Sequence, residues 1–177
     1  MKRIALAMLG LLVSASASPG GDFEAWGPVL ADHELRAPDG GTTTLSDLRG
    51  DVVVVNFWAS WCKPCKRELV HLNEWADEVG SSGVHVVAVS IDRDRRKAER
   101  FVDEAELTLP VYYDGPTGLA RDLDLPWLPC TVIVDGDGRV VRVDGGGAPE
   151  TLRAMQGAVR SLVGSTGRPV PDEEEAG

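Results

Sequence analysis

Residues 52–72, VVVVNFWASWCKPCKRELVHL, constrain the possible folds of this chain more than any other segment. The four valines and the aromatic residues after them predict a strand covered on both faces, as in the centre of an α/β sheet. From Leu69 onward, apolar residues recur at three- and four-residue steps between charged ones, which predicts an amphipathic helix. Two cysteines, Cys62 and Cys65, lie where the predicted strand gives way to the predicted helix.

The remaining patterns complete an α/β chain. Two short strands are expected around the Asp39-Gly40-Gly41 turn, with Ser46 capping a single helical turn after them. Further strands are predicted at 84–91, 109–112, 131–135 and 139–143, and helices within 92–107, near 118–123 and at 149–163. This order indicates an α/β fold with a central mixed β-sheet flanked by helices, in which the last hairpin supplies the antiparallel edge.

The N-terminus has the pattern of an export signal. Lys2 and Arg3 precede an apolar run at 4–13, and Ala15-Ser16-Ala17 has the shape of a signal peptidase site. We therefore expect residues 1–17 to be a signal peptide and the protein to be exported to a periplasmic or other extracytoplasmic space. The run is shorter than the ~20 residues of a membrane span, but an uncleaved, membrane-tethering anchor stays open as an alternative.

The rest of the chain is long enough for one domain with a real core. Residues 18–30 are rich in Ser, Pro and Gly and are expected to be a linker, and the domain is expected to cover 31–163. Residues 164–177 carry a run of acidic residues without an apolar period, which predicts a disordered tail.

Charge and cysteine content exclude some classes of function. The formal net charge is −10, so we expect no nucleic-acid partner, because phosphate backbones would be repelled. The chain has 3 cysteines, too few for a disulfide scaffold, and the odd count leaves Cys130 as a thiol to be explained.

The cysteine pair has the setting of a redox centre. At a helix start, unpaired backbone N–H groups and the helix dipole stabilise an anion, so Cys62 should have a depressed pKa and act as the nucleophilic thiolate. Lys63 adds a positive charge nearby, and Pro64 stiffens the first turn. Cys65 lies on the same helix face but deeper, as a resolving thiol would. The Cys62–Cys65 disulfide would then be the redox group, with no other cofactor and no metal.

Two other interpretations of the cysteine pair remain open. One is a purely structural disulfide. The other is half of a metal site, as in a copper- or zinc-binding chaperone that uses Cys62, Cys65 and a histidine, although no second Cys-x-x-Cys motif follows.

The motif FWASWCKPCKRE, preceded by LSDLRGDVVVVN and followed by LPCTVIVDGDGRVV, resembles the TlpA/ResA-like branch of the thioredoxin superfamily. The resemblance covers about residues 31–163. It implies a thioredoxin fold, here with an N-terminal β-hairpin extension. It also implies an exported thiol-disulfide oxidoreductase, often one that supplies electrons to oxidised apocytochrome c or to another periplasmic disulfide.

The resemblance also assigns roles to residues. It makes Cys62 the attacking cysteine, Cys65 the resolving one and Pro129 a cis-proline that faces them. Glu68 matches an acidic residue one turn below the pair, which implies proton handling; a surface charge at a helix start is the alternative. The residues expected to contact substrate are Trp61, Lys63, Pro64 and Leu128.

Cys130 departs from the family pattern, which commonly has threonine after the cis-proline. It is either a small buried residue with an inert thiol or a third thiol that competes with Cys65 near the bound substrate. Strand alternation alone does not tell which way it points.

Together these features predict a monomeric disulfide reductase. Its partners would be a protein disulfide substrate, such as apocytochrome c, and a membrane thiol that donates electrons. The same pair run in reverse would make an oxidase or isomerase, because the direction depends on the reduction potential.

Overall fold

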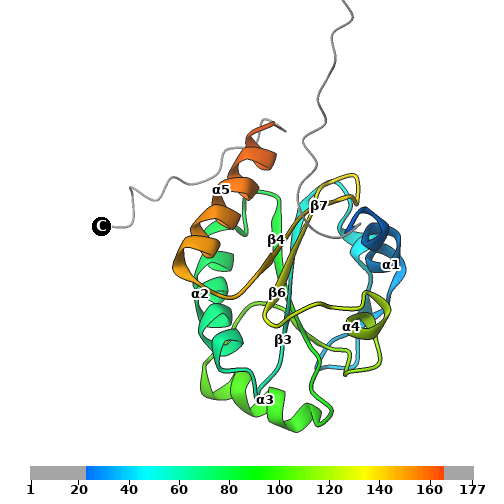
Figure 1. The fold of residues 1–177 in the computed structure, drawn as a ribbon, viewed down its shortest axis with the longest axis vertical. Coiled ribbons are helices and arrows are strands. Elements are labelled where there is room, and N and C mark those ends of the chain that lie inside the picture. The colour runs from blue at the N-terminus through cyan, green and yellow to red at the C-terminus, as the bar shows by residue number, and fades with distance from the viewer. Residues whose placement is uncertain (1–22, 166–177) are drawn as a thin grey trace, which may run out of the picture.

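A five-stranded mixed sheet forms the centre of the protein, whose computed structural model describes residues 23–165 (Figure 1). The strand order is β5-β4-β3-β6-β7. The strands are β3 (Val52–Trp58), β4 (Val84–Ser90), β5 (Val111–Tyr113), β6 (Cys130–Val134) and β7 (Val140–Gly145). Strands β3, β4 and β5 are parallel, whereas β6 runs antiparallel to β3 and β7 antiparallel to β6. This confirms the predicted mixed sheet with its antiparallel edge.

Helices cover both faces of the sheet. One face carries α2 (Lys63–Val79), α3 (Arg95–Glu104) and α5 (Pro149–Ser165), and the other carries α1 (Trp26–Asp32) and α4 (Leu119–Asp122) (Figure 1). Because side chains alternate along a strand, β3 feeds two apolar cores. Val54 packs with Leu69 and other residues on the α2 face, and Val55 packs with Leu30 and others on the opposite face.

The expected linker at 18–30 is wrong for the part that the structure describes. The 3-10 turn η1 (Phe23–Ala25) leads into α1, whose Leu30 is buried under the sheet. Pro28 falls in the first turn of α1, where its missing N–H costs little. Gly27 lies so close to the β6–β7 turn that a Cβ there would be 3.0 Å from the carbonyl oxygen of Gly138. The folded domain therefore begins before residue 31.

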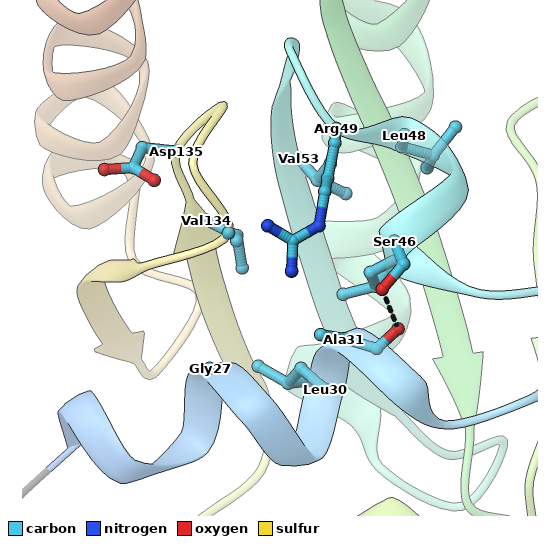
Figure 2. A pocket seen from close by; sticks show the side chains of 11 residues that line it. Gly27, Leu30, Ala31, Ser46, Leu48, Arg49, Val53, Val134 and Asp135 are labelled. Carbon is cyan, nitrogen blue, oxygen red and sulfur yellow. Dashed lines mark hydrogen bonds between the residues drawn. The ribbon is translucent and has the colours of Figure 1, made fainter.

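A second contact ties α1 to the N-terminal extension. The Ser46 hydroxyl donates a hydrogen bond of 2.9 Å to the carbonyl of Ala31 (Figure 2). The space between these segments, lined by Leu30, Val53 and Val134 among others, has a volume of about 10 Å³, room for about one water molecule. The α1 helix thus packs closely against this face of the sheet.

The predicted β-hairpin extension is present. Strands β1 (Leu35–Arg36) and β2 (Thr42–Thr43) pair antiparallel, and the 3-10 turn η2 (Leu45–Leu48) follows. The cap differs from the prediction: Thr44 precedes the turn, and its backbone N–H donates to Asp47 at 2.8 Å. Ser46 lies inside the turn, where its side chain contacts α1 instead.

The predicted signal peptide lies outside the described residues, as does residue 166 onward of the predicted tail. The final helix α5 runs through Ser165, slightly beyond the domain end expected at 163. Within residues 23–165, no helix combines the length and apolar character that a membrane span requires.

Candidate active site

The cysteine pair lies at the junction of β3 and α2. Cys62 is the N-cap residue of α2, and its Sγ accepts the backbone N–H of Cys65 at 3.3 Å. Cys62 and Cys65 form a disulfide with a Cα–Cα distance of 5.3 Å. A thiolate at this position would receive an N–H bond and the favourable end of the helix dipole.

The two sulfur-bearing residues differ in accessibility. Cys62 is 6 % exposed, whereas Cys65 is fully buried. Both belong to the apolar core on the α2 face, which also contains Trp58 and Ala59. An incoming disulfide would therefore reach Cys62 before Cys65.

Glu68 is a buried carboxyl, 4 % exposed, rather than a surface charge. It lies three residues after Cys65, on the same face of α2. Its Oε1 accepts hydrogen bonds from Thr131 Oγ1 at 2.7 Å and from Asn56 Nδ2 at 3.1 Å. Burial raises the pKa of Glu68 above its ordinary value, the bond from Thr131 opposes that shift, and the negative charge of Asp144 adds to it.

The strand order brings Pro129 to the same end of the sheet. The Leu128–Pro129 peptide bond is cis, and Pro129 is buried directly before β6. The next residue, Cys130, pairs with Phe57 near the end of β3, close in sequence to the cysteine loop.

Cys130 points away from the disulfide. It is fully buried in the core on the opposite face of the sheet, with Val55 and Leu119, while its neighbour Thr131 faces Glu68. Burial raises the pKa of the Cys130 thiol to about 12, with smaller contributions from the charges of Glu68 and Asp144.

An open groove adjoins the cysteine loop. Its volume is about 590 Å³, and it is lined by Trp61, Ile91, Pro116, Ala120, Arg121, Leu125, Trp127 and Leu128. Two of the residues expected to contact substrate, Trp61 and Leu128, are among these. Lys63 and Pro64 are exposed in the first turn of α2 and do not line the groove.

Sequence reasoning missed a carboxylate that holds the cysteine loop. Asp92, at the carboxyl end of β4, accepts the backbone N–H of Ser60 at 2.8 Å and the Ser60 hydroxyl at 2.7 Å. Ser90 Oγ donates to the same carboxylate at 3.0 Å. Because β3 and β4 are parallel neighbours, an acidic residue after β4 was a signal that could have found this contact.

Three further residues around Glu68 were also missed. Asn56 and Thr131 face each other across β3 and β6 and both bond to Glu68. Gly147 has a positive φ of 45°, and a Cβ there would lie 2.8 Å from Glu68 Oε2. Two features of the sequence could have pointed to these residues. One is the polar residue inside the valine-rich strand, and the other is the run of three glycines at 145–147.

The histidines take part in other contacts. His33 bonds to Asp114 at 2.7 Å, and His85 bonds to Asp51 at 2.9 Å. His71 lies on an exposed part of α2, 3.6 Å from Glu74. Among the described residues, no group of three or more His, Cys, Asp or Glu side chains is arranged to hold a metal ion.

Comparison with known proteins gives consistent matches. The sequence pattern of the AhpC/TSA family matches residues 27–143. The thiol-disulfide oxidoreductase ResA of Geobacillus thermodenitrificans is 31 % identical over 138 residues, which cover 78 % of this chain and 79 % of that protein. ResA of Bacillus subtilis is 28 % identical over 149 residues, 84 % of this chain and 83 % of that one.

Solved structures with the same fold include related redox proteins. A Chlorobium tepidum protein assigned as the thiol:disulfide interchange protein DsbE superposes with a TM-score of 0.71 at 27 % identity, covering 76 % of this chain and 94 % of that one. A secreted Mycobacterium tuberculosis disulfide oxidoreductase, homologous to Escherichia coli DsbE, gives a TM-score of 0.66 at 23 % identity, covering 76 % and 98 %. The predicted thioredoxin fold is thereby confirmed.

Proposed function

The chain belongs to the AhpC/TSA family and is a thiol-disulfide oxidoreductase of the ResA-like thioredoxin branch, and we propose that it reduces protein disulfides outside the cytoplasm. The observation that carries the proposal is the Cys62–Cys65 disulfide at the start of α2, in which Cys62 alone retains some exposure. The reaction needs no redox group besides this pair.

The proposed reaction has two exchange steps. The Cys62 thiolate attacks one sulfur of the substrate disulfide, which forms a mixed disulfide and releases a first substrate thiolate that takes a proton from solvent. Cys65 then gives its proton to Glu68 and attacks Cys62 Sγ. This attack forms the Cys62–Cys65 disulfide and releases the second substrate thiolate.

The groove beside Trp61 is the proposed contact surface for substrate. Aromatic and aliphatic side chains dominate its lining, which suits an unfolded segment that carries apolar residues near its cysteines. Pro129 and Leu128 would contact the substrate backbone next to the disulfide, with Lys63 and Pro64 at the rim.

The N-terminal sequence pattern supports an extracytoplasmic role. Residues 1–17 would be a cleaved signal peptide, and one protein of the same fold is described as secreted. An oxidised apocytochrome c is the candidate substrate, and a membrane thiol protein would return electrons to Cys62–Cys65. Sequencing the N-terminus of exported protein should give a start near Ser18, whereas an intact Met1 in a cytoplasmic form would contradict export.

The order of attack is tested by trapping. An oxidised Cys-x-x-Cys-His peptide, the haem-attachment motif of c-type cytochromes, serves as substrate. The Cys65→Ser variant should accumulate a mixed disulfide on non-reducing gels, and the matched Cys62→Ser variant should not. The reverse pattern would exchange the two roles, and no adduct with either variant would count against disulfide exchange.

The direction of electron flow is tested by the reduction potential of the pair. Equilibration with defined thiol–disulfide buffers should give a value near that of thioredoxin, roughly −270 mV, for a reductase. A value near roughly −120 mV, as in DsbA, would instead favour an oxidase that runs the same pair in reverse.

A further inference from the structure

The hydrogen bonds around Glu68 have a defined direction. An amide nitrogen can only donate, so Asn56 Nδ2 donates both to Glu68 Oε1 at 3.1 Å and to Thr131 Oγ1 at 2.8 Å. The Thr131 hydroxyl, which has one hydrogen, then donates it to Glu68 Oε1 at 2.7 Å. Oε1 therefore receives two donors, and Oε2 receives none among the described residues.

This arrangement distinguishes the two carboxyl oxygens chemically. An oxygen that accepts two hydrogen bonds is stabilised as the unprotonated oxygen, because a proton on it would face the Asn56 and Thr131 donors. Oε2 is buried against Gly147 and accepts no hydrogen bond from the described part of the chain. A proton on Glu68 is therefore held on Oε2.

We propose that Asn56 and Thr131 are positioning residues that hold Oε1 of Glu68 as a fixed acceptor, so that Oε2 is the oxygen that takes the proton from Cys65. The inference rests on the proposed function, in which Glu68 accepts that proton. The S–H bond of Cys65 breaks, an O–H bond forms at Oε2, and the electron pair left on sulfur attacks Cys62 Sγ. The Cys62–substrate bond breaks, and its electron pair leaves with the substrate thiolate.

Other groups that face Glu68 act on its charge without bonding to it. From β7, Asp144 raises the pKa of Glu68, and Arg142 pairs with Asp144 at 2.8 Å. Cys130 on β6 lies on the opposite face of the sheet, and its thiol, with a pKa raised to about 12, stays neutral near pH 7 and adds no charge. From the start of α2, Cys62 and Cys65 change charge during the reaction. The uncharged residues Asn56 and Thr131 are thus the groups that orient the carboxyl.

The test compares Thr131→Val with Thr131→Ser. Valine matches the shape of threonine but removes the donor, and serine keeps the hydroxyl. In single-turnover release of substrate from the mixed disulfide, Thr131→Val should move the pH midpoint upward by about one unit, because a bond that lowers the Glu68 pKa is lost. Thr131→Ser should have the same pH midpoint as the wild-type protein.

Infrared difference spectra of reduced against oxidised protein test the assignment to Oε2. The C=O band of protonated Glu68 is identified by its loss in Glu68→Gln. If the proton is on Oε2, the C=O oxygen is Oε1, and losing the Thr131 donor should move the band to higher frequency. An unmoved band in Thr131→Val would overturn the assignment.

The outcomes separate this inference from the proposed function. If Glu68→Gln leaves the pH profile of release unchanged, Glu68 does not accept the proton and the proposed role of Glu68 fails. Glu68→Gln could abolish the pH dependence of release while Thr131→Val changes neither the pH midpoint nor the C=O band of Glu68. In that case only the positioning role fails. If Thr131→Ser behaves like Thr131→Val, packing rather than the hydrogen bond is responsible, which also overturns the positioning role.

Discussion

Cys130 is a thiol held out of contact with the disulfide by its place on the sheet. With a pKa of about 12, roughly one thiol in 10⁴ would be ionised at pH 8. We predict that Cys130 in the folded, oxidised protein resists alkylation at pH 8 and reacts once the protein is unfolded, as measured by mass spectrometry. Cys130→Thr should leave turnover unchanged.

In this experiment the Cys62–Cys65 disulfide protects the other two cysteines, so Cys130 is the sole thiol that can react. Fast alkylation of the folded protein would show that the Cys130 thiol is accessible and reactive. A peptide that links Cys130 to either other cysteine would show that it takes part in exchange.

The buried Glu68 should make the folded protein less stable as pH rises. Its pKa is raised in the folded state above its ordinary value of 4.5, so the folded state binds the proton more tightly than the unfolded state does. The free energy of unfolding should therefore fall as pH rises from about 4.5 through the raised pKa. Urea unfolding of the oxidised protein from pH 4 to 8 measures this fall.

The control is Glu68→Gln, which has no titrating group at this position. Its stability should decline less over the same pH range, so the difference between the two proteins should change steadily with pH. Two parallel curves would mean that Glu68 is not held in its protonated form by burial.

The end of β7 and the loop that follows it contain glycines that pack closely against two side chains. A Cβ at Gly145 would collide with the ring of Trp127, and one at Gly147 would lie 2.8 Å from Glu68 Oε2. Gly146, between them, has a φ of 95°, but a Cβ there would meet no other atom within 4 Å. The loop therefore offers a matched pair of substitutions that differ in whether they touch Glu68.

We predict that Gly147→Ala and Gly146→Ala both lower the free energy of unfolding by about 1–2 kcal/mol, because alanine is strained at positive φ. Gly147→Ala alone should also shift the pH profile of mixed-disulfide release, since it displaces the Glu68 carboxyl. Urea unfolding and stopped-flow release measure the two effects. An equal pH shift in Gly146→Ala would assign the effect to the loop backbone instead.

The strands and the helix that frame the disulfide were predictable because each has a strong local signal. The valine run of β3 and the apolar period of α2 both point to their observed structure. The Asp92–Ser60 contact had one signal in the sequence, the acidic residue after β4, but using it requires knowing that β3 and β4 are neighbours. The direction of Cys130 was not predictable, because it depends on the register of β6 against β3. The helix α1 was missed because Gly27 and Pro28 are typical of linkers, and its stability comes from the packing of Leu30.

Docking of α1 should contribute to the stability of the whole domain. Leu30 is 1 % exposed, whereas its neighbour Val29 is 37 % exposed. We predict that Leu30→Ala lowers the free energy of unfolding by about 2–4 kcal/mol, and that Val29→Ala changes it by less than about 0.5 kcal/mol. Urea unfolding monitored by circular dichroism measures both. Similar values for the two variants would show that α1 is not an integral part of the domain.

The described chain enters and leaves the domain far from its disulfide. Gly27 lies against the β6–β7 turn, at the end of the sheet where Val53 pairs with Val134, whereas Cys130 pairs with Phe57 at the disulfide end. The helix α5 has 17 residues, which gives it a length of about 25 Å at the helical rise per residue. It carries the chain away from the loop that contains Gly147, toward the opposite end of the sheet (Figure 1). A protein attached to an electrode or a reporter at either end of residues 23–165 would thus present its disulfide on the side away from the attachment.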